Sequence, residues 1–148
     1  MAGSGSEIEV VIDSSVAVKW FTRENETDEA IAIKSGHVRG TTEVWVSDLL
    51  YHEVANALRF KDDFDEKKLA LAVENLFGLH LNTRPVDQDL LNSAASIAYH
   101  SEVTINDAIP VALAKLRGTV CITADENTQF KRTKAKGYPV QLLSRETR

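Results

Sequence analysis

A short apolar run near the amino end of the chain, residues 8–12, constrains the fold most strongly. Its sequence, Ile-Glu-Val-Val-Ile, is rich in β-branched residues and stops at the polar cluster Asp13-Ser14-Ser15. Such a run predicts a buried strand, and the spacing of apolar residues over 15–21 predicts a helix directly after it. Asp13 is therefore expected where a strand gives way to a helix, which in open α/β sheets is where ligands bind.

Further apolar runs alternate with segments of helical spacing along the whole chain. Strand-like runs are found at 43–47, 79–86, 119–123 and 140–143. Between and after them lie predicted helices at 26–37, 49–60, 67–76, from 87 onward, at 108–116 and at 125–136. This alternation predicts an α/β fold with a mainly parallel sheet, covered by helices on both faces, and with residues 140–143 at a sheet edge.

Length and composition favour one globular domain in a reducing compartment. The 148 residues fit a single domain over 7–148, preceded by a small, flexible tail over 1–6 that is either native or left from cloning. The one cysteine, Cys121, lies in an apolar run and is expected to be a core residue. With no apolar stretch near ~20 residues and no secretory signal, we expect a cytoplasmic protein that does not enter a membrane.

The net charge limits the class of partner. At −5, it argues against a general polyanion binder. It leaves open a nuclease whose acidic centre holds a divalent metal, since the metal then supplies the positive charge that nucleic acid requires.

One glutamate lies where an acid is costly. On a helical wheel, Glu53 falls inside the apolar arc of the predicted 49–60 helix. A carboxylate there must be paired or must bind a metal. Pairing with Arg59 or Lys61 stays open as the simpler interpretation.

Three aspartates, Asp13, Asp107 and Asp125, fall at expected helix starts, and Asp13 and Asp125 each follow a strand. Helix capping is the simpler interpretation for each of them alone. Thr104 and Asp107 have the spacing of a capping box. However, Pro110 lacks an N–H group and favours a helix that starts near Asp107 itself.

All four acids can meet at the carboxyl end of the predicted sheet. Two carboxylates at ~5 Å repel by roughly 3 kcal/mol at an effective dielectric constant of 20. Four of them together would take up protons or bind hard cations, and oxygen ligands suit one or two Mg²⁺ or Mn²⁺ ions. Because no serine has a recognisable His–Asp partner set and the four histidines show no ligand spacing, we expect hydrolysis by metal-activated water.

Four motifs then resemble those of PIN-domain ribonucleases, most closely the toxin subunits of VapBC toxin–antitoxin pairs. They are Ile12-Asp13-Ser14-Ser15, Glu53-Val-Ala-Asn56-Ala-Leu58, Asn106-Asp107-Ala108 and Ile122-Thr123-Ala124-Asp125. The resemblance spans residues 7–143. Pro110 departs from it, because relatives more often carry a residue there that does not constrain the helix.

The resemblance implies a three-layer α/β/α fold and metal-dependent RNA cleavage at the four acids, Asp13, Glu53, Asp107 and Asp125. It also implies that Ser14 and Thr123 act as supporting hydroxyls. As partners it implies a second copy of the chain in a homodimer and a small VapB-like antitoxin that inserts into the site.

Two other interpretations remain open. A phosphotransfer domain that uses Asp13 as nucleophile would need a second acid nearby, where this chain has Ser15. A PIN-like scaffold that binds RNA or protein without cleavage would not need to tolerate four repelling acids.

Basic residues that could bind RNA are concentrated in the predicted 125–136 helix. Lys131, Arg132 and Lys134 are the candidates for phosphate contacts. A solvated helix face, with cations near its carboxyl end, is the alternative. The many apolar residues of the 49–60 and 67–76 helices are expected to include a dimer or antitoxin surface.

Overall fold

A five-stranded, all-parallel sheet forms the centre of the computed structural model, which describes residues 8–145. The strands are β1 (Ile8–Ile12), β2 (Thr42–Ser47), β3 (Asn82–Arg84), β4 (Cys121–Thr123) and β5 (Val140–Leu142). Their spatial order is β3-β2-β1-β4-β5, which confirms β5 as an edge strand. The predicted tail over residues 1–6 lies outside the described residues.

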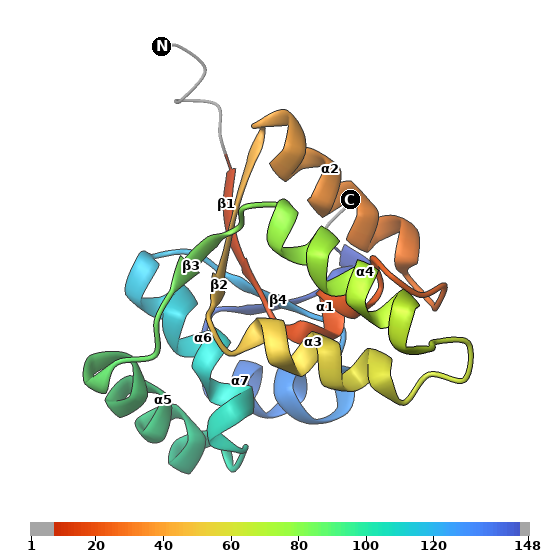
Figure 1. The fold of residues 1–148 in the computed structure, drawn as a ribbon. Helices are drawn as coiled ribbons and strands as arrows, with labels where there is room; N and C mark the ends of the chain where they lie inside the picture. Colours follow the sequence, from red (N-terminus) through yellow and green to blue (C-terminus); the bar gives the residue numbers. More distant parts are fainter. Residues whose placement is uncertain (1–7, 146–148) are drawn as a thin grey trace.

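Helices cover both faces of the sheet, so the predicted three-layer α/β/α arrangement is confirmed (Figure 1). On one face lie α1 (Ser14–Val18), α2 (Thr27–Arg39), α3 (Leu50–Arg59) and α4 (Glu66–Gly78). On the other lie α5 (Gln88–Ser101) and α6 (Ile105–Arg117). After β4 the chain forms a π-helical turn, η2 (Glu126–Phe130), then α7 (Lys131–Ala135), and a 3₁₀ turn, η3 (Leu143–Arg145), ends the described chain.

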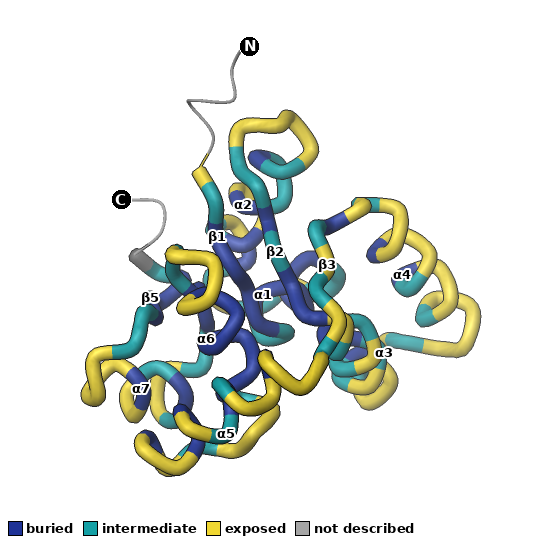
Figure 2. The backbone as a smooth tube through the Cα atoms, turned by 90° about the vertical axis from the view of Figure 1, so that its left-hand side faces the viewer, coloured by how far each residue is buried: buried dark blue, intermediate teal, exposed yellow. Residues whose placement is uncertain are grey.

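Strand alternation divides β1 between two apolar cores. Val10 and Ile12 pack with α1 to α4, whereas Val11 packs with α5 and α6. The tube in Figure 2 is dark blue along the centre of the sheet and yellow on the outer sides of the helices. The central strand is thus apolar on both sides, as expected of a parallel sheet between two helical layers.

The topology places the end of β1 at a switch point. β1 pairs with β2 on one side and with β4 on the other, so the direction of chain progression across the sheet reverses there. A crevice opens at the carboxyl ends of strands at such a point. Asp13, the residue after β1, therefore lies at the position that a doubly wound sheet uses for ligands.

The predicted start of the helix that carries Pro110 is wrong. α6 begins at Ile105, with Thr104 as its N-cap, and the Thr104 hydroxyl accepts the Asp107 N–H at 3.1 Å. Pro110 lies inside the helix, where its missing N–H leaves the carbonyl four residues earlier, on Asn106, without its usual helical donor. Asn106 is exposed, so water can solvate that carbonyl, and the cap decides where the helix starts.

Two other elements are shorter than predicted. The 79–86 strand reduces to β3 (Asn82–Arg84), because Leu79 ends α4 and Pro85 has no N–H for the sheet. The predicted 125–136 helix divides into η2 and α7. Among the described residues, no helix is both long and apolar enough to cross a bilayer.

An arginine closes the face covered by α5 and α6. The Arg117 guanidinium carbon lies 3.6 Å from the centroid of the Trp45 ring, and Arg117 Nε donates to a carboxylate oxygen of Glu9 at 2.6 Å. A second bond runs from Nη2 to the other Glu9 oxygen at 3.2 Å. This stacked, bidentate pair ties the end of α6 to β1 and β2.

Replacement of this arginine by lysine should destabilise the fold. Arg117→Lys keeps the charge but loses the planar fork and the stacking, so the free energy of unfolding is expected to fall by about 1 kcal/mol in urea denaturation. Arg23→Lys is the matched control, because the Arg23–Asp28 pair is exposed, with 72% and 83% side-chain exposure. An equal loss in both variants would contradict a special role for Arg117.

Candidate active site

Asp13 is the buried centre of the carboxyl end of the sheet. It is 8% exposed and is the N-cap of α1, where its Oδ1 accepts the Ser15 N–H at 3.0 Å. The Ser15 hydroxyl donates to the same oxygen, and the Thr123 hydroxyl lies 2.6 Å from Oδ2. The predicted capping role is thus real, and it leaves the carboxylate fixed between β1 and β4.

A chain of hydrogen bonds extends from Asp13 to two other acids. Thr123 Oγ1 accepts the Asp125 N–H at 3.0 Å and lies 3.1 Å from Gln129 Oε1. Gln129 Nε2 in turn donates to the Asp107 carbonyl at 2.9 Å. Buried Gln129 therefore connects the exit of β4 to the first turn of α6, and with them the segments that carry Asp13, Asp107 and Asp125.

Burial makes the Asp13 carboxylate costly. Desolvation raises the pKa of Asp13 to about 6, against the opposing effect of hydrogen bonds from Ser15 and Thr123. Within residues 8–145, no ion pair of Asp13 is found that would offset this cost. The carboxyl group is held by hydroxyls rather than by a cation.

Glu53 shares this environment. The pKa of Glu53 is raised, first by burial and then by the negative charges of Asp13 and Asp107, while nearby His52 acts in the opposite direction. Neither Arg59 nor Lys61 pairs with it in the described chain: Arg59 lies over the Phe60 ring and Lys61 pairs with Glu24. The simpler interpretation of Glu53 as half of an ion pair is therefore wrong.

Asp107 and Asp125 are the remaining two acids, and the negative charge of Asp125 acts on Asp107. The pKa of Asp107 is raised by burial and by the charge of Asp125, with a hydrogen bond to Thr104 acting against this. Asp125 also caps η2, since its Oδ1 accepts the Thr128 N–H at 3.2 Å. Electrostatic coupling thus links Asp13 to Glu53, Glu53 to Asp107 and Asp107 to Asp125.

The four acids offer the oxygen ligands that a hard cation prefers, but they do not surround a single metal position. Every candidate ligand is a carboxylate oxygen, and burial raises the pKa values of Asp13, Glu53 and Asp107. No group of three His, Cys, Asp or Glu side chains in the described part of the chain is arranged to hold one metal ion. Mg²⁺ commonly takes only one or two carboxylates and keeps several waters, so the residues fit an ion bound in that manner.

Two adjoining hollows open onto these acids. A small cavity of about 10 Å³ is bounded by Asp13, Ser14, Ser47, Glu53 and Asn106, together with apolar side chains. Next to it lies an open hollow of about 600 Å³, and it shares Glu53 and Asn106 with the small cavity. Its remaining walls are His52, Ala55 and Asn56.

Several residues of the site were not expected from the sequence. Ser15 makes hydrogen bonds to Asp13, whereas Ser14, the serine implied by the resemblance, lines the small cavity. Gln129 and Ser47 were also missed. The usable signal for Ser15 was its position two residues after a helix-capping aspartate, where hydroxyls often bond to the cap.

The three predicted RNA-binding residues do not line either hollow. Arg132 donates to the Glu102 carbonyl at 2.6 Å and so ties α7 to the loop before α6. Lys134 lines a separate hollow beside β5. Lys131 is exposed on α7.

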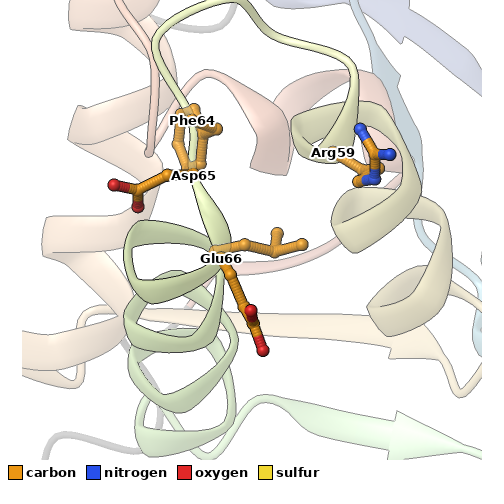
Figure 3. Close-up of a pocket in the computed structure, with 5 residues that line it drawn as sticks. Arg59, Phe64, Asp65 and Glu66 are labelled. Atoms are coloured by element: carbon orange, nitrogen blue, oxygen red, sulfur yellow. The ribbon is translucent and has the colours of Figure 1, made fainter.

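Another hollow of about 440 Å³ contains none of the four acids. It lies where α3 ends and α4 begins, and is lined by Arg59, Phe64, Asp65, Glu66 and Leu69 (Figure 3). Its Asp65 caps α4 by accepting the Lys68 N–H at 2.8 Å. The predicted charged turn and helix start are confirmed here, and the hollow offers no convergent catalytic groups.

The raised pKa of Asp13 predicts a pH-dependent stability difference. The folded state holds the Asp13 proton up to about pH 6, whereas the unfolded chain releases it near 3.9, so stability is lost as the pH rises from 4 to above 6. Asp13→Asn removes this charge. The new amide can donate to the Thr123 oxygen, and the Thr123 hydroxyl can then donate to Gln129 Oε1.

Without divalent metal, Asp13→Asn should be more stable than the parent chain at pH 7.5 by up to roughly 3 kcal/mol, with no difference below pH 4. Urea denaturation across this pH range measures it. Asp28→Asn, at an exposed residue, should give no comparable change. A difference that does not vary with pH would show that burial of the Asp13 charge is not its cause.

Comparisons with known proteins agree with this geometry. The family model described as PIN domain matches residues 10–136. Among solved structures, a toxin–antitoxin complex from Klebsiella pneumoniae is similar, at 18% identity and a TM-score of 0.66 over 90% of this chain and 97% of that one. FitAcB from Neisseria gonorrhoeae is similar at 16% identity and a TM-score of 0.67, over 92% and 99% of the two chains.

A third similar structure is VapC20 from Mycobacterium tuberculosis, described as a sarcin–ricin loop cleaving toxin. It has 16% identity and a TM-score of 0.63, with 87% of this chain and 95% of that one covered. No curated protein matches by sequence. The structural matches show the shared fold, and the family model covers most of the chain. The chain therefore belongs to the PIN domain family.

Proposed function

We propose that this protein is a metal-dependent ribonuclease. The observation that carries the proposal is the convergence of Asp13, Glu53 and Asp107 at one end of the sheet, with raised pKa values and no cationic partner among the described residues. Fixed negative charge without a counter-charge is costly unless a cation binds. The membership of the PIN domain family supports the same reaction class.

The four acids have different surroundings and would take different roles. Both oxygens of Asp13 are anchored, so it would hold a cation in place, and Asp107 and Asp125 would act on that ion through water molecules. Glu53 makes no side-chain hydrogen bond in residues 8–145 and is free to accept a proton from water. A bound Mg²⁺ or Mn²⁺, as one ion or two, would neutralise charge that develops on the phosphate and acidify water.

The reaction is hydrolysis of a phosphodiester bond. The oxygen of a water molecule forms a bond to phosphorus, and the bond from phosphorus to the leaving ribose oxygen breaks. One water proton passes to Glu53, and the leaving oxygen gains a proton from solvent. Ser14 and Thr123 support the acids, Thr123 through its bond to Asp13 and Ser14 from the cavity wall.

Cleavage of RNA in Mg²⁺ or Mn²⁺ tests this assignment. Ribosomal RNA that includes the sarcin–ricin loop is a suitable first substrate, because VapC20 is described as cleaving that loop. Asp13→Asn, Glu53→Gln and Asp107→Asn should each lower kcat at least a hundredfold, and chelation of the metal should abolish cleavage. Asp48→Asn, an exposed acid near the same sheet end, is the control and should cleave normally. Undiminished cleavage by the first three variants would refute the proposal.

A catalytically silent scaffold is the alternative, and one observation favours it. No three acids of the described chain are arranged to hold one ion. Calorimetric titration with Mn²⁺ separates the two. Binding that is lost in Asp13→Asn supports the nuclease, whereas no binding supports a scaffold.

The biological role that we propose is the toxin of a type II toxin–antitoxin pair, acting in the cytoplasm as a homodimer with a VapB-like antitoxin. Similar structures include toxin–antitoxin complexes. α3 and α4 supply apolar surface for a partner, since Phe60, Leu71 and Phe77 are 72%, 56% and 56% exposed. Growth arrest on expression, relieved by co-expression of a short adjacent reading frame, tests this role.

The basic residues of α7 give a further prediction about RNA. If Lys131, Arg132 and Lys134 contact phosphate, the double variant Lys131→Gln with Lys134→Gln should weaken RNA binding. The slope of the logarithm of the binding constant against the logarithm of the salt concentration should become less steep by about two, because each lost phosphate contact means about one fewer counterion released on binding. Lys67→Gln with Lys68→Gln, on α4, is a charge-matched control. An unchanged slope would leave α7 as a solvated surface.

A further inference from the structure

Ser47 lies beside Asp13 at the end of the neighbouring strand. The register of β1 and β2 ends with the pair Val11 and Trp45; continued by two residues it sets Asp13 opposite Ser47, and both residues line the small cavity. Alternation along β2 sends Val46 into the core under α1 to α4, so Trp45 and Ser47 face the opposite layer, as do Val11 and Asp13. The two side chains are therefore neighbours on the same face of the sheet.

The Ser47 hydroxyl has no protein partner in the described part of the chain. The residue is 6% exposed. Nearby buried polar side chains are all bonded: Thr123 to Asp13, Gln129 to Asp107, and Thr133 to the Gln129 carbonyl. Among the described residues, Ser101 Oγ is the one fully covered side-chain oxygen without a partner, so the unpartnered Ser47 oxygen is not fully covered. It faces the small cavity that Ser47 lines, where a water molecule can supply its hydrogen bond.

The space in front of Ser47 has the size of one water molecule. The cavity bounded by Asp13, Ser14, Ser47, Glu53 and Asn106 measures about 10 Å³, close to the smallest volume that holds a water. Its walls carry carboxylates that accept, an amide that donates and a hydroxyl that does either. A buried water needs two to four such partners, and this cavity supplies them.

We propose that Ser47 is a positioning residue that holds a single water molecule between Asp13 and Glu53. The catalytic role of this water rests on the proposed nuclease function: it is the water molecule that attacks the phosphodiester. The Ser47 hydroxyl fixes the water's orientation and Glu53 lies within the same cavity to take its proton. The cavity is too small for a nucleotide, so Ser47 acts on the water and not on the RNA.

Crystal structures of the metal-free parent chain and of Ser47→Ala test the water site directly. In the parent chain, a water oxygen is expected at about 2.8 Å from Ser47 Oγ. In Ser47→Ala that water should be lost or displaced. A dry cavity in the parent chain, or a water that keeps its position in the variant, would overturn the proposal.

Kinetics and metal binding test the consequence. Ser47→Ala should lower kcat about tenfold, the effect of one lost orienting hydrogen bond, with KM for RNA, Mn²⁺ affinity and Tm unchanged. Ser101→Ala is the matched control, because Ser101 is also buried without a hydrogen-bond partner in the described chain but lines neither hollow. It should change none of these quantities.

The outcomes separate this inference from the proposed function. Parent-like kcat in Ser47→Ala, beside active parent enzyme, overturns the role of Ser47 and leaves the nuclease intact. A parent chain that cleaves no RNA refutes the nuclease and with it the catalytic role of the water, while the crystal structures still decide whether Ser47 holds one.

Discussion

The burial of a carboxylate at the end of the central strand is the constraint on which the rest of the site depends. Asp13 lies where β1, β2 and β4 meet, and it is held by hydroxyls from Ser15 and Thr123, with no basic side chain of residues 8–145 paired to it. Hydrogen bonds lower the cost of the charge without removing it, so the pKa stays near 6. The fold therefore buries an acid whose ionised form would be stabilised by a nearby positive charge.

The two apolar cores make this arrangement possible. β1 is packed on both sides, which fixes the backbone at Asp13 and leaves this residue only 8% exposed. Gln129 then connects the β4 exit to α6, so that Asp107 and Asp125 are held relative to Asp13 by the same network. Like charges remain near one another because packing and hydrogen bonds elsewhere outweigh their repulsion.

The helix starts show how an aspartate can cap a helical segment and still belong to the acidic group. Asp13 and Asp125 each cap a helical segment and also belong to the acidic group, while Thr104, not Asp107, caps α6. Capping uses Oδ1 of each aspartate, while Oδ2 of Asp13 accepts the Thr123 hydroxyl. Asp107 is thereby released from a structural role, and its raised pKa comes from burial and from Asp125.

Local sequence patterns were enough to predict the order and type of most elements and the parallel sheet with β5 at its edge, and they singled out four acids as candidates for one site. Apolar periodicity and acids in unusual positions are local signals, and they can be read without knowing what lies opposite. The tertiary structure alone decided that α6 begins before Pro110, that Ser15 and Gln129 hold the acids in place, and that Ser47 has no partner. These features depend on hydrogen bonds and voids between residues far apart in the chain, such as Asp13 and Thr123, and the identity of a polar residue does not reveal which distant group it will meet.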